Sequence, residues 1–220
     1  MTGAAAKLLC IALLAAGAAR GEEAPRVRSI PTSDGGAVTA SEWGSGTRGV
    51  VLAHGAVFDR TSWDPLARRL AERGLRVLAL DLRRDASGRP RPVDVWRLDV
   101  RAGIEALRGE GAQQVSVVGA SLGGRAAADC LTEEPIGELD RVVLLAPAGA
   151  RAPEKLPGRK LVVLSRDEPA AAQIRQLYER MPEPKELEEL PGGAHAQHVF
   201  RSAAGPALEE RLVRFLSGTP

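Results

Sequence analysis

Residues 114–125 read Gln114-Val115-Ser116-Val117-Val118-Gly119-Ala120-Ser121-Leu122-Gly123-Gly124-Arg125, and helix-forming residues continue to Leu131. The β-branched run predicts a strand, the glycines predict a sharp turn, and the following segment predicts a helix. In a G-x-S-x-G turn, glycine is needed because the strand and helix backbones approach closely. The turn therefore presents the Ser121 hydroxyl above the sheet, at a helix N-terminus with unpaired N–H groups.

Two other interpretations of this turn compete with a reactive serine. Ser121 could be the N-cap of an ordinary helix that follows a strand, without any catalytic role. A phosphate-binding loop fits poorly. The dinucleotide fingerprint requires glycine where Ser121 stands, and Gly123-Gly124-Arg125 lacks the Gly-Lys-Ser/Thr of a P-loop.

The overall composition is that of an ordinary globular protein. The chain has 220 residues, of which 44% are hydrophobic and 26% charged, enough for one substantial core and hence one domain. The formal net charge is only +2, and aromatic residues make up 3%. Neither a basic face nor a set of stacking aromatics indicates nucleic-acid binding, so no nucleic-acid partner is expected.

The N-terminal residues 1–21 have the layout of a secretory signal peptide. Lys7 precedes an apolar run from Leu8 to Ala16, and small residues close it before the first charged residues. The run is shorter than the roughly 20 residues of a membrane span. We expect the signal to be cleaved, the protein to be secreted or periplasmic, and no stable membrane insertion afterwards. Cys130 is then the only cysteine, so an intramolecular disulfide is excluded.

After the signal, residues 26–220 predict an α/β fold. Two short extended segments flank the turn formers Ser33-Asp34-Gly35-Gly36 and predict an antiparallel hairpin. Apolar strands then alternate with amphipathic helices, which predicts a mostly parallel central sheet with helices on both faces. The segments concerned are strands at 26–31, 37–43, 49–53, 77–80, 115–118, 141–146, 160–164 and 185–190, and helices near 64–71, 93–107, 125–131, 174–178 and 208–216.

A serine nucleophile needs a base within hydrogen-bond reach, and the chain has three histidines. His54 follows an earlier strand, and we expect it at the floor of the site, beside an oxyanion donor. His195 and His198 lie in the loop before the last helix. Small residues flank His195 and permit a loop that reaches inward, whereas a starting helix would carry His198 away, so His195 is the predicted base.

The acid that orients the base is sought at the C-terminal end of a neighbouring strand, where chemistry gathers in such sheets. The predicted strand at residues 160–164 ends at that edge, where it is followed by Ser165-Arg166-Asp167-Glu168. We predict Asp167 as the acid, since a short side chain at a strand end holds an imidazole with little freedom. Asp167 or Glu168 could instead belong to the first turn of a helix. Asp81, at the end of another strand, is the reserve candidate.

The chain order serine, acid, histidine is that of the α/β-hydrolases. The sequence resembles this superfamily from about Arg26 to the C-terminus, specifically its small members without a cap domain, of the dienelactone-hydrolase and bacterial carboxylesterase kind. The resemblance rests on the segments around His54-Gly55-Ala56, Gly119 to Gly124, and Gly192 to His195. It implies an α/β-hydrolase fold without a cap domain, with Ser121 as nucleophile, His195 as base and Asp167 as acid.

The resemblance further implies an oxyanion hole formed by the backbone N–H groups of Ala56 and Leu122, with Val57 as the alternative to Ala56. The implied reaction is cleavage of a small-molecule ester through an acyl-enzyme, without metal or organic cofactor. Dienelactone hydrolases carry a cysteine nucleophile, and the serine here favours ordinary esters. We expect substrate contacts from His54 and from the loop around Phe58.

Two further functions remain open at this stage. A lipid acyl hydrolase or thioesterase would use the same residues on another acyl substrate. A ligand-binding protein could keep the fold without catalysis, because fold does not determine function. Neither substrate identity nor oligomeric state is specified by the residue pattern.

Overall fold

The structure is a computed structural model, and it describes residues 24–133 and 137–218. Its described residues form an eight-stranded sheet in the order β1-β2-β4-β3-β5-β6-β7-β8. The strands are β1 Arg26–Pro31, β2 Ala37–Trp43, β3 Arg48–Ala53, β4 Leu75–Asp81, β5 Gln114–Ala120, β6 Arg141–Leu145, β7 Arg159–Ser165 and β8 Lys185–Leu190. The helices are α1 Asp64–Glu72, α2 Val93–Gly109, α3 Ser121–Glu133, α4 Ala171–Glu179 and α5 Gly205–Ser217.

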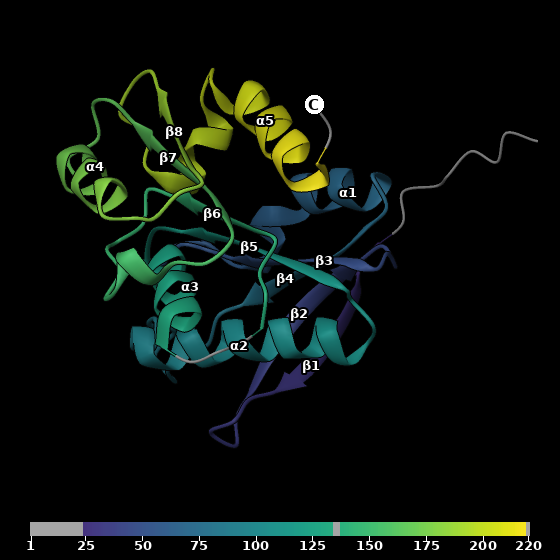
Figure 1. Cartoon of the computed structure of the whole chain (residues 1–220). Helices are drawn as coiled ribbons and strands as arrows, with labels where there is room; N and C mark the ends of the chain where they lie inside the picture. Colours follow the sequence, from purple (N-terminus) through teal and green to yellow (C-terminus); the bar gives the residue numbers. More distant parts are fainter. Residues whose placement is uncertain (1–23, 134–136, 219–220) are drawn as a thin grey trace, which may run out of the picture.

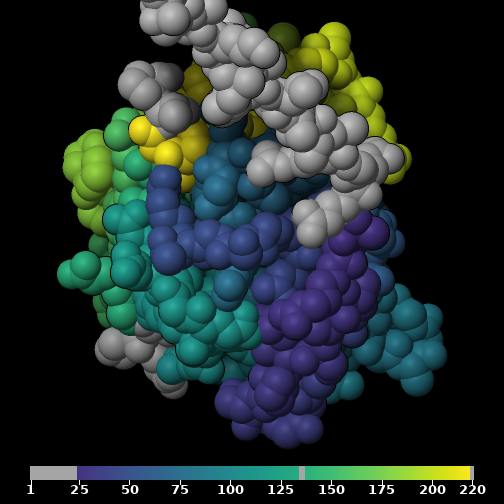
Figure 2. All heavy atoms as spheres, turned by 90° about the vertical axis from the view of Figure 1, so that its right-hand side faces the viewer, coloured from purple at the N-terminus to yellow at the C-terminus, as the bar shows by residue number. Residues whose placement is uncertain are grey.

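The predicted hairpin is confirmed at one edge of this sheet. β1 pairs antiparallel with β2 through the register Arg26 to Glu42 and Pro31 to Ala37, and β2 pairs antiparallel with β4. All remaining pairs, from β4 to β8, are parallel. Figure 2 shows β1, in purple, on the surface of the molecule, as expected for the outermost strand.

The helices cover both faces of the sheet. α1 and α5 lie side by side on one face, and α2 and α3 pack together on the other (Figure 1). The central strands β3 and β5 are buried on both faces, and this explains why they are continuous apolar runs without alternation. The predicted architecture, a mostly parallel sheet with an N-terminal antiparallel hairpin and helices on both faces, is therefore confirmed.

Short 3₁₀ helices were not predicted, and the first of them affects the start of α1. A 3₁₀ helix, η1 (Arg60–Trp63), precedes α1, and the Asp59 carboxylate caps it by accepting a hydrogen bond from the Thr61 amide. α1 consequently has Trp63 at its N-cap, and Asp64 lies inside the first turn rather than capping it.

The other edge of the sheet is β8, whose sequence is Lys185-Glu186-Leu187-Glu188-Glu189-Leu190. Its carboxylates are paired with arginines of neighbouring elements. Glu186 contacts Arg159 and Arg211, and Glu189 contacts Arg175. This edge strand is thus half-buried and strongly charged.

No cap domain separates β6 from β7. The chain between them, residues 146–158, is fully described and contains only a short 3₁₀ turn, Pro153–Lys155. No helix in the described parts of the chain combines the length and the apolar character needed to span a membrane. The expected signal peptide, residues 1–21, lies outside the described residues.

Candidate active site

Ser121 stands at the junction of β5 and α3, as the sequence predicted. It is the first residue of α3, and its φ of 51° places it in the left-handed region that side chains rarely adopt. The neighbouring Ala148 amide donates a hydrogen bond to the Ser121 carbonyl at 3.0 Å, which helps to hold this conformation. A strained nucleophile turn of this kind exposes its hydroxyl at the end of the strand.

The glycines around Ser121 are required by close backbone contacts. A Cβ atom on Gly119 would lie 2.6 Å from the Cα of Gly124, and one on Gly123 would lie 2.3 Å from the carbonyl oxygen of His54. Both distances are far shorter than any real contact of a Cβ atom. The absent side chains therefore let α3 begin against both β5 and the end of β3.

The structure brings His195 to the serine. Its Nε2 lies 2.9 Å from the Ser121 Oγ, although the residues are 74 positions apart in the chain. The His195 side chain is 41% exposed, so one side of the pair is open to solvent. This is the contact that a base needs to accept the serine proton.

The acid prediction was wrong by one residue. Glu168, rather than Asp167, contacts the base, with its Oε2 2.6 Å from the His195 Nδ1. The chain turns directly after β7, so the buried Glu168 side chain folds back and its Oε1 accepts a hydrogen bond from the Ser165 amide. Asp167 lies at the exposed side of this turn. The longer side chain of glutamate covers the distance that the turn adds.

The loop that carries the base is fastened to the loop that carries the acid. The Ser165 hydroxyl donates to the Ala194 carbonyl at 2.6 Å, and the Asp167 amide donates to the Gly192 carbonyl at 3.0 Å. Asp167 thus contributes through its backbone and not through its carboxylate. These contacts place the imidazole between Glu168 and Ser121.

The predicted oxyanion donors lie on either side of the serine. Leu122 is the second residue of α3, so its N–H belongs to the first turn, where no intrahelical acceptor exists. The segment after β3 lies close by, because a Cβ on Gly55 would be 3.5 Å from the Cβ of Ser121. In the described chain, neither Ala56 nor Val57 donates its amide to a loop carbonyl, so the choice between them stays open.

His54 lies beneath the site, as expected, but its burial leaves no side-chain atom exposed for the expected substrate contact. Its side chain is wholly buried, since its Nε2 accepts a hydrogen bond from the Leu82 amide and its Nδ1 lies 2.7 Å from the Gly55 carbonyl. The first contact requires an unprotonated Nε2, so the second is donated by Nδ1–H. His54 thus joins the ends of β3 and β4 beneath the site.

Phe58 and His198 lie together beside the site. Their rings are tilted with centroids 4.9 Å apart, and the Arg201 guanidinium lies over the Phe58 ring. His198 is exposed and is not hydrogen-bonded to Ser121 in the way that His195 is. The choice of His195 over His198 therefore agrees with the geometry. Contact of Phe58 with a substrate remains a prediction.

A buried acid anchors the loop after β4. Asp99 of α2 accepts hydrogen bonds from the Arg83 amide at 3.0 Å and from the Arg83 Nε at 2.6 Å. Burial raises the pKa of the Asp99 carboxyl to about 6, against the opposing effect of these Arg83 contacts. The next residue, Arg84, donates to the carbonyls of Ala56 and Phe58 at 2.7 and 2.8 Å. The loop thus holds the segment that contains the predicted oxyanion donor.

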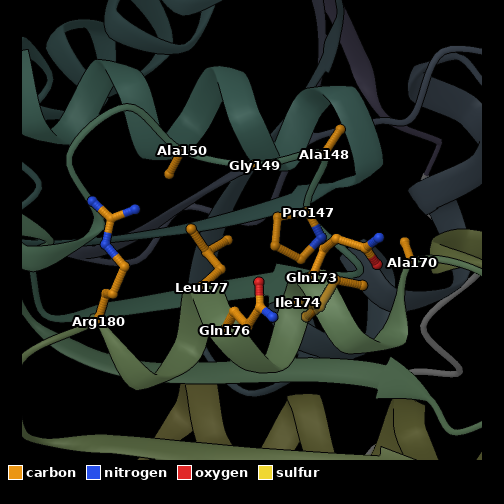
Figure 3. Close-up of a pocket in the computed structure, with 10 residues that line it drawn as sticks. All are labelled: Pro147, Ala148, Gly149, Ala150, Ala170, Gln173, Ile174, Gln176, Leu177 and Arg180. Atoms are coloured by element: carbon orange, nitrogen blue, oxygen red, sulfur yellow. The ribbon is translucent and has the colours of Figure 1, made fainter.

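A cavity of about 510 Å³ opens between the loop after β6 and helix α4. Figure 3 shows Pro147, Ala148 and Ala150 on one side of it and Ile174 and Leu177 on the other, with Gln173 near the Ala148 end. Ala148 is bonded to the backbone of Ser121, and Ala170 lies two positions after Glu168. One end of the cavity is therefore lined by Ala148, whose amide is bonded to Ser121, and by Ala170, which follows the acid loop.

The described residues contain no cluster of three or more histidine, cysteine, aspartate or glutamate side chains suited to a metal ion. Cys130, on α3, is buried, and its burial raises the pKa of the thiol to about 12. It therefore behaves as a small apolar side chain rather than as a nucleophile.

The model of the alpha/beta hydrolase family matches residues 50–217, which is most of the sequence. The chain belongs to the α/β-hydrolase family. The match spans the strand before the oxyanion segment, the nucleophile turn and the loops of the acid and the base.

Solved structures with the same fold include enzymes of several kinds. An esterase from Pyrococcus furiosus superposes with a TM-score of 0.69 at 17% identity, over 88% of this chain and 90% of its own. A dienelactone hydrolase from Anabaena variabilis gives 0.70 at 17%, over 89% and 97%. A monoacylglycerol lipase from Paleococcus ferrophilus gives 0.68 at 16%, over 83% and 99%. No curated protein matches the chain.

Proposed function

We propose that this α/β-hydrolase is a serine hydrolase that cleaves carboxylic esters through Ser121, His195 and Glu168. The observation that carries the proposal is the continuous pair of contacts, 2.9 Å from the Ser121 Oγ to the His195 Nε2 and 2.6 Å from the His195 Nδ1 to Glu168. A serine hydroxyl is a weak nucleophile alone, and a base oriented by a third group is what activates it.

The reaction proceeds by acyl transfer in two steps. His195 Nε2 accepts the proton of Ser121 as the Oγ attacks the ester carbonyl, and Glu168 stabilises the imidazolium that forms. The imidazolium then gives this proton to the departing alkoxide, and the acyl group stays on the serine. In the second step His195 takes a proton from water, the hydroxide attacks the acyl-enzyme, and Ser121 is released protonated together with the carboxylic acid.

The negative charge that develops on the carbonyl oxygen needs donors placed in advance. The Leu122 amide at the start of α3 supplies one, and the amide of Ala56 supplies the other, with Val57 as the alternative. Loss of a single oxyanion donor commonly costs on the order of 10²- to 10³-fold in kcat. The contacts of Arg84 with the carbonyls of Ala56 and Phe58 support this role, because they restrain the segment.

The cavity beside α4 offers a place for an apolar part of the ester. Its walls carry small and aliphatic side chains together with Gln173, Gln176 and Arg180. One end lies at Ala148, whose amide is bonded to the Ser121 carbonyl. A lipid acyl hydrolase or a thioesterase would use the same arrangement. A series of nitrophenyl esters of increasing acyl length, together with acyl thioesters, separates these substrates by their relative kcat/KM values.

The experiment that tests the proposal is active-site labelling. Wild-type protein is treated with a fluorophosphonate probe, and the modified peptide is identified by mass spectrometry, with Ser121→Ala as the control. We expect labelling at Ser121, hydrolysis of nitrophenyl acetate by the wild type, and neither in the variant. A folded wild-type protein that is neither labelled nor active would contradict the proposal and favour a ligand-binding role.

The N-terminal segment supports a location outside the cytoplasm. Its charged start, apolar centre and small residues before Arg20 are those of a cleaved signal peptide, so we propose a secreted or periplasmic enzyme. The mass of the mature protein from its native host tests this, since cleavage removes about 21 residues. An intact N-terminus would contradict it.

A further inference from the structure

Gln197 is a buried polar side chain that the reaction described above does not use. It lies in the 3₁₀ helix η3 (Ala196–Arg201), two residues after His195, and is 2% exposed. Both ends of its amide group are hydrogen-bonded. Its Oε1 accepts from the Gly55 amide at 2.7 Å, and its Nε2 donates to the Ser62 Oγ at 2.7 Å.

The orientation of this amide group is fixed by its second partner. The Ser62 hydroxyl donates its own proton to the Asp59 carbonyl at 2.5 Å, so only a lone pair of its oxygen is available to Gln197. The Nε2 end must therefore face Ser62, and the Oε1 end must face Gly55. A flipped amide would place two donors against each other at Gly55 and two acceptors at Ser62.

The Gly55 amide lies next to the reacting centre. Gly55 directly precedes Ala56, and a Cβ on Gly55 would be 3.5 Å from the Cβ of Ser121 and 3.6 Å from the Gln197 Oε1. The peptide group that Gln197 holds is therefore one residue before the peptide whose N–H is proposed to face the oxyanion. Only the two dihedral angles at the Gly55 Cα separate these peptides, so holding the first narrows the positions open to the second.

The chain between the base and Gln197 adopts a conformation that serves both. Ala196 has a φ of 49°, in the left-handed region, and is 4% exposed. This conformation is strained for a residue other than glycine, so the surrounding contacts must hold it. It lets His195 point to Ser121 while Gln197, from the same loop, points to Gly55.

We propose that Gln197 is a positioning residue that holds the oxyanion segment in register with the catalytic base. It acts through the Gly55 amide and does not touch the substrate. One loop then sets two parts of the site at once, the imidazole through its backbone and the oxyanion donor through its amide. The inference rests on the proposed ester hydrolysis for its kinetic test, but not for its structural one.

The kinetic test compares Gln197→Met, which keeps the length without the amide, with Val199→Ala as the matched control. Val199 is buried in the same 3₁₀ helix and makes no side-chain hydrogen bond to the site. We expect Gln197→Met to lower kcat about 10- to 100-fold, which is less than the loss when an oxyanion donor is deleted altogether. Its KM should stay within about threefold of the wild-type value. Ser62→Ala, which frees the far end of the amide, should lower kcat by a smaller factor.

A fall in kcat without a rise in KM separates positioning from general destabilisation, because partial unfolding only lowers the amount of active enzyme and is removed when kcat is calculated per folded molecule. The proposal is overturned if Gln197→Met has a kcat within twofold of Val199→Ala at matched folded fraction. It is equally overturned if KM rises by the same factor as kcat falls, which would mean that substrate binding was lost instead.

The structural test does not depend on activity. Hydrogen exchange of the Gly55 amide, measured by NMR on the full chain, should be at least tenfold faster in Gln197→Met than in Val199→Ala. Unchanged exchange in a folded variant contradicts the proposal, even if the enzyme proves active. Faster exchange in a protein that cleaves no ester would instead keep the inference and contradict the proposed function.

Discussion

The Oε2 of Glu168 and the Nδ1 of His195 lie 2.6 Å apart, and this contact identifies the acid of the site. Glu168→Gln keeps the shape but removes the charge that stabilises the imidazolium. We expect kcat for nitrophenyl esters to fall on the order of 10²- to 10⁴-fold, as for other triads in which the acid becomes an amide. The measurement is steady-state hydrolysis at pH 8.

Asp167→Asn is the matched control for this substitution. It makes the same chemical change one residue earlier, on a side chain that lies in solvent. We expect its kcat/KM to stay within about twofold of the wild type, as is usual for exposed positions. The assignment of Glu168 would be wrong if Asp167→Asn were the inactive variant of the two.

Gly123 lies where the nucleophile turn meets the end of β3. In Gly123→Ala the new methyl group would be 2.3 Å from the His54 carbonyl oxygen. This oxygen belongs to the backbone, so relieving the clash would require the chain itself to move. We expect a loss of about 2–3 kcal/mol or more in the free energy of unfolding, since forced overpacking typically costs 1–3 kcal/mol. Urea denaturation followed by circular dichroism measures it.

At Gly109, by contrast, we expect the change from glycine to alanine to raise the free energy of unfolding. Gly109 is the last residue of α2, and a Cβ there would meet no atom within 4 Å. Gly109→Ala should stabilise the protein by about 0.5–1 kcal/mol, because glycine loses more backbone freedom on folding. Equal effects of the two substitutions would refute the close-contact explanation for Gly123.

The cavity beside α4 predicts a change in substrate preference. Gln173 is exposed and lines the cavity near Ala148, so Gln173→Trp narrows it without entering the core. We expect kcat/KM for octanoyl esters to fall about tenfold relative to acetyl esters, since an apolar group that loses its pocket forfeits on the order of 1–3 kcal/mol.

Ala172→Trp is the control, because Ala172 is exposed on the same helix but does not line the cavity. Its ratio of octanoyl to acetyl kcat/KM should match the wild type. If both tryptophan variants keep the wild-type ratio, the cavity does not receive the acyl group.

Asp99 predicts a pH dependence of stability. Burial raises the pKa of its carboxyl from 3.8 to about 6 in the folded chain. Between these values the folded protein holds a proton that the unfolded chain has lost, so the free energy of unfolding falls as pH rises. The stabilisation from this group is fully present below about pH 4 and is lost as pH rises through about 6.

The measurement compares the wild type with Asp99→Asn, which cannot titrate. Relative to Asp99→Asn, the wild type should lose on the order of 2–3 kcal/mol of unfolding free energy between pH 4 and pH 7, at 1.36 kcal/mol per pKa unit. Denaturant titrations at several pH values supply it. A difference that is independent of pH would show that the Asp99 carboxyl has its ordinary pKa.

Much of the fold could be predicted from local sequence because its strongest signals are local. The buried parallel strands are continuous apolar runs, and the nucleophile turn needs glycines at fixed positions, as Gly119 and Gly123 confirm. The chain order of serine, acid and histidine then follows from the alternation of strands and helices. His195 was predictable because small residues flank it on both sides.

The acid and the positioning residue could not be predicted in this way. The choice between Asp167 and Glu168 depends on the direction of the turn after β7. This turn leaves the Asp167 side chain exposed and buries that of Glu168, its neighbour. Gln197 has no signature of its own, since its partners Ser62 and Gly55 lie 135 and 142 positions away. Only the assembled sheet edge brings them together. His54 was correctly expected at the floor of the site, but no local signal indicates that it is fully buried with its Nε2 bonded to the Leu82 amide.

The edge strand β8 also affects how the molecule behaves among its own copies. A second chain that extended the sheet there would cover Glu186 and Glu189, together with the arginines paired with them, and remove water from these charges. The charges along this border therefore act as a barrier to polymerisation. Strong acid removes that barrier, because protonated glutamates no longer resist being covered by a neighbouring strand.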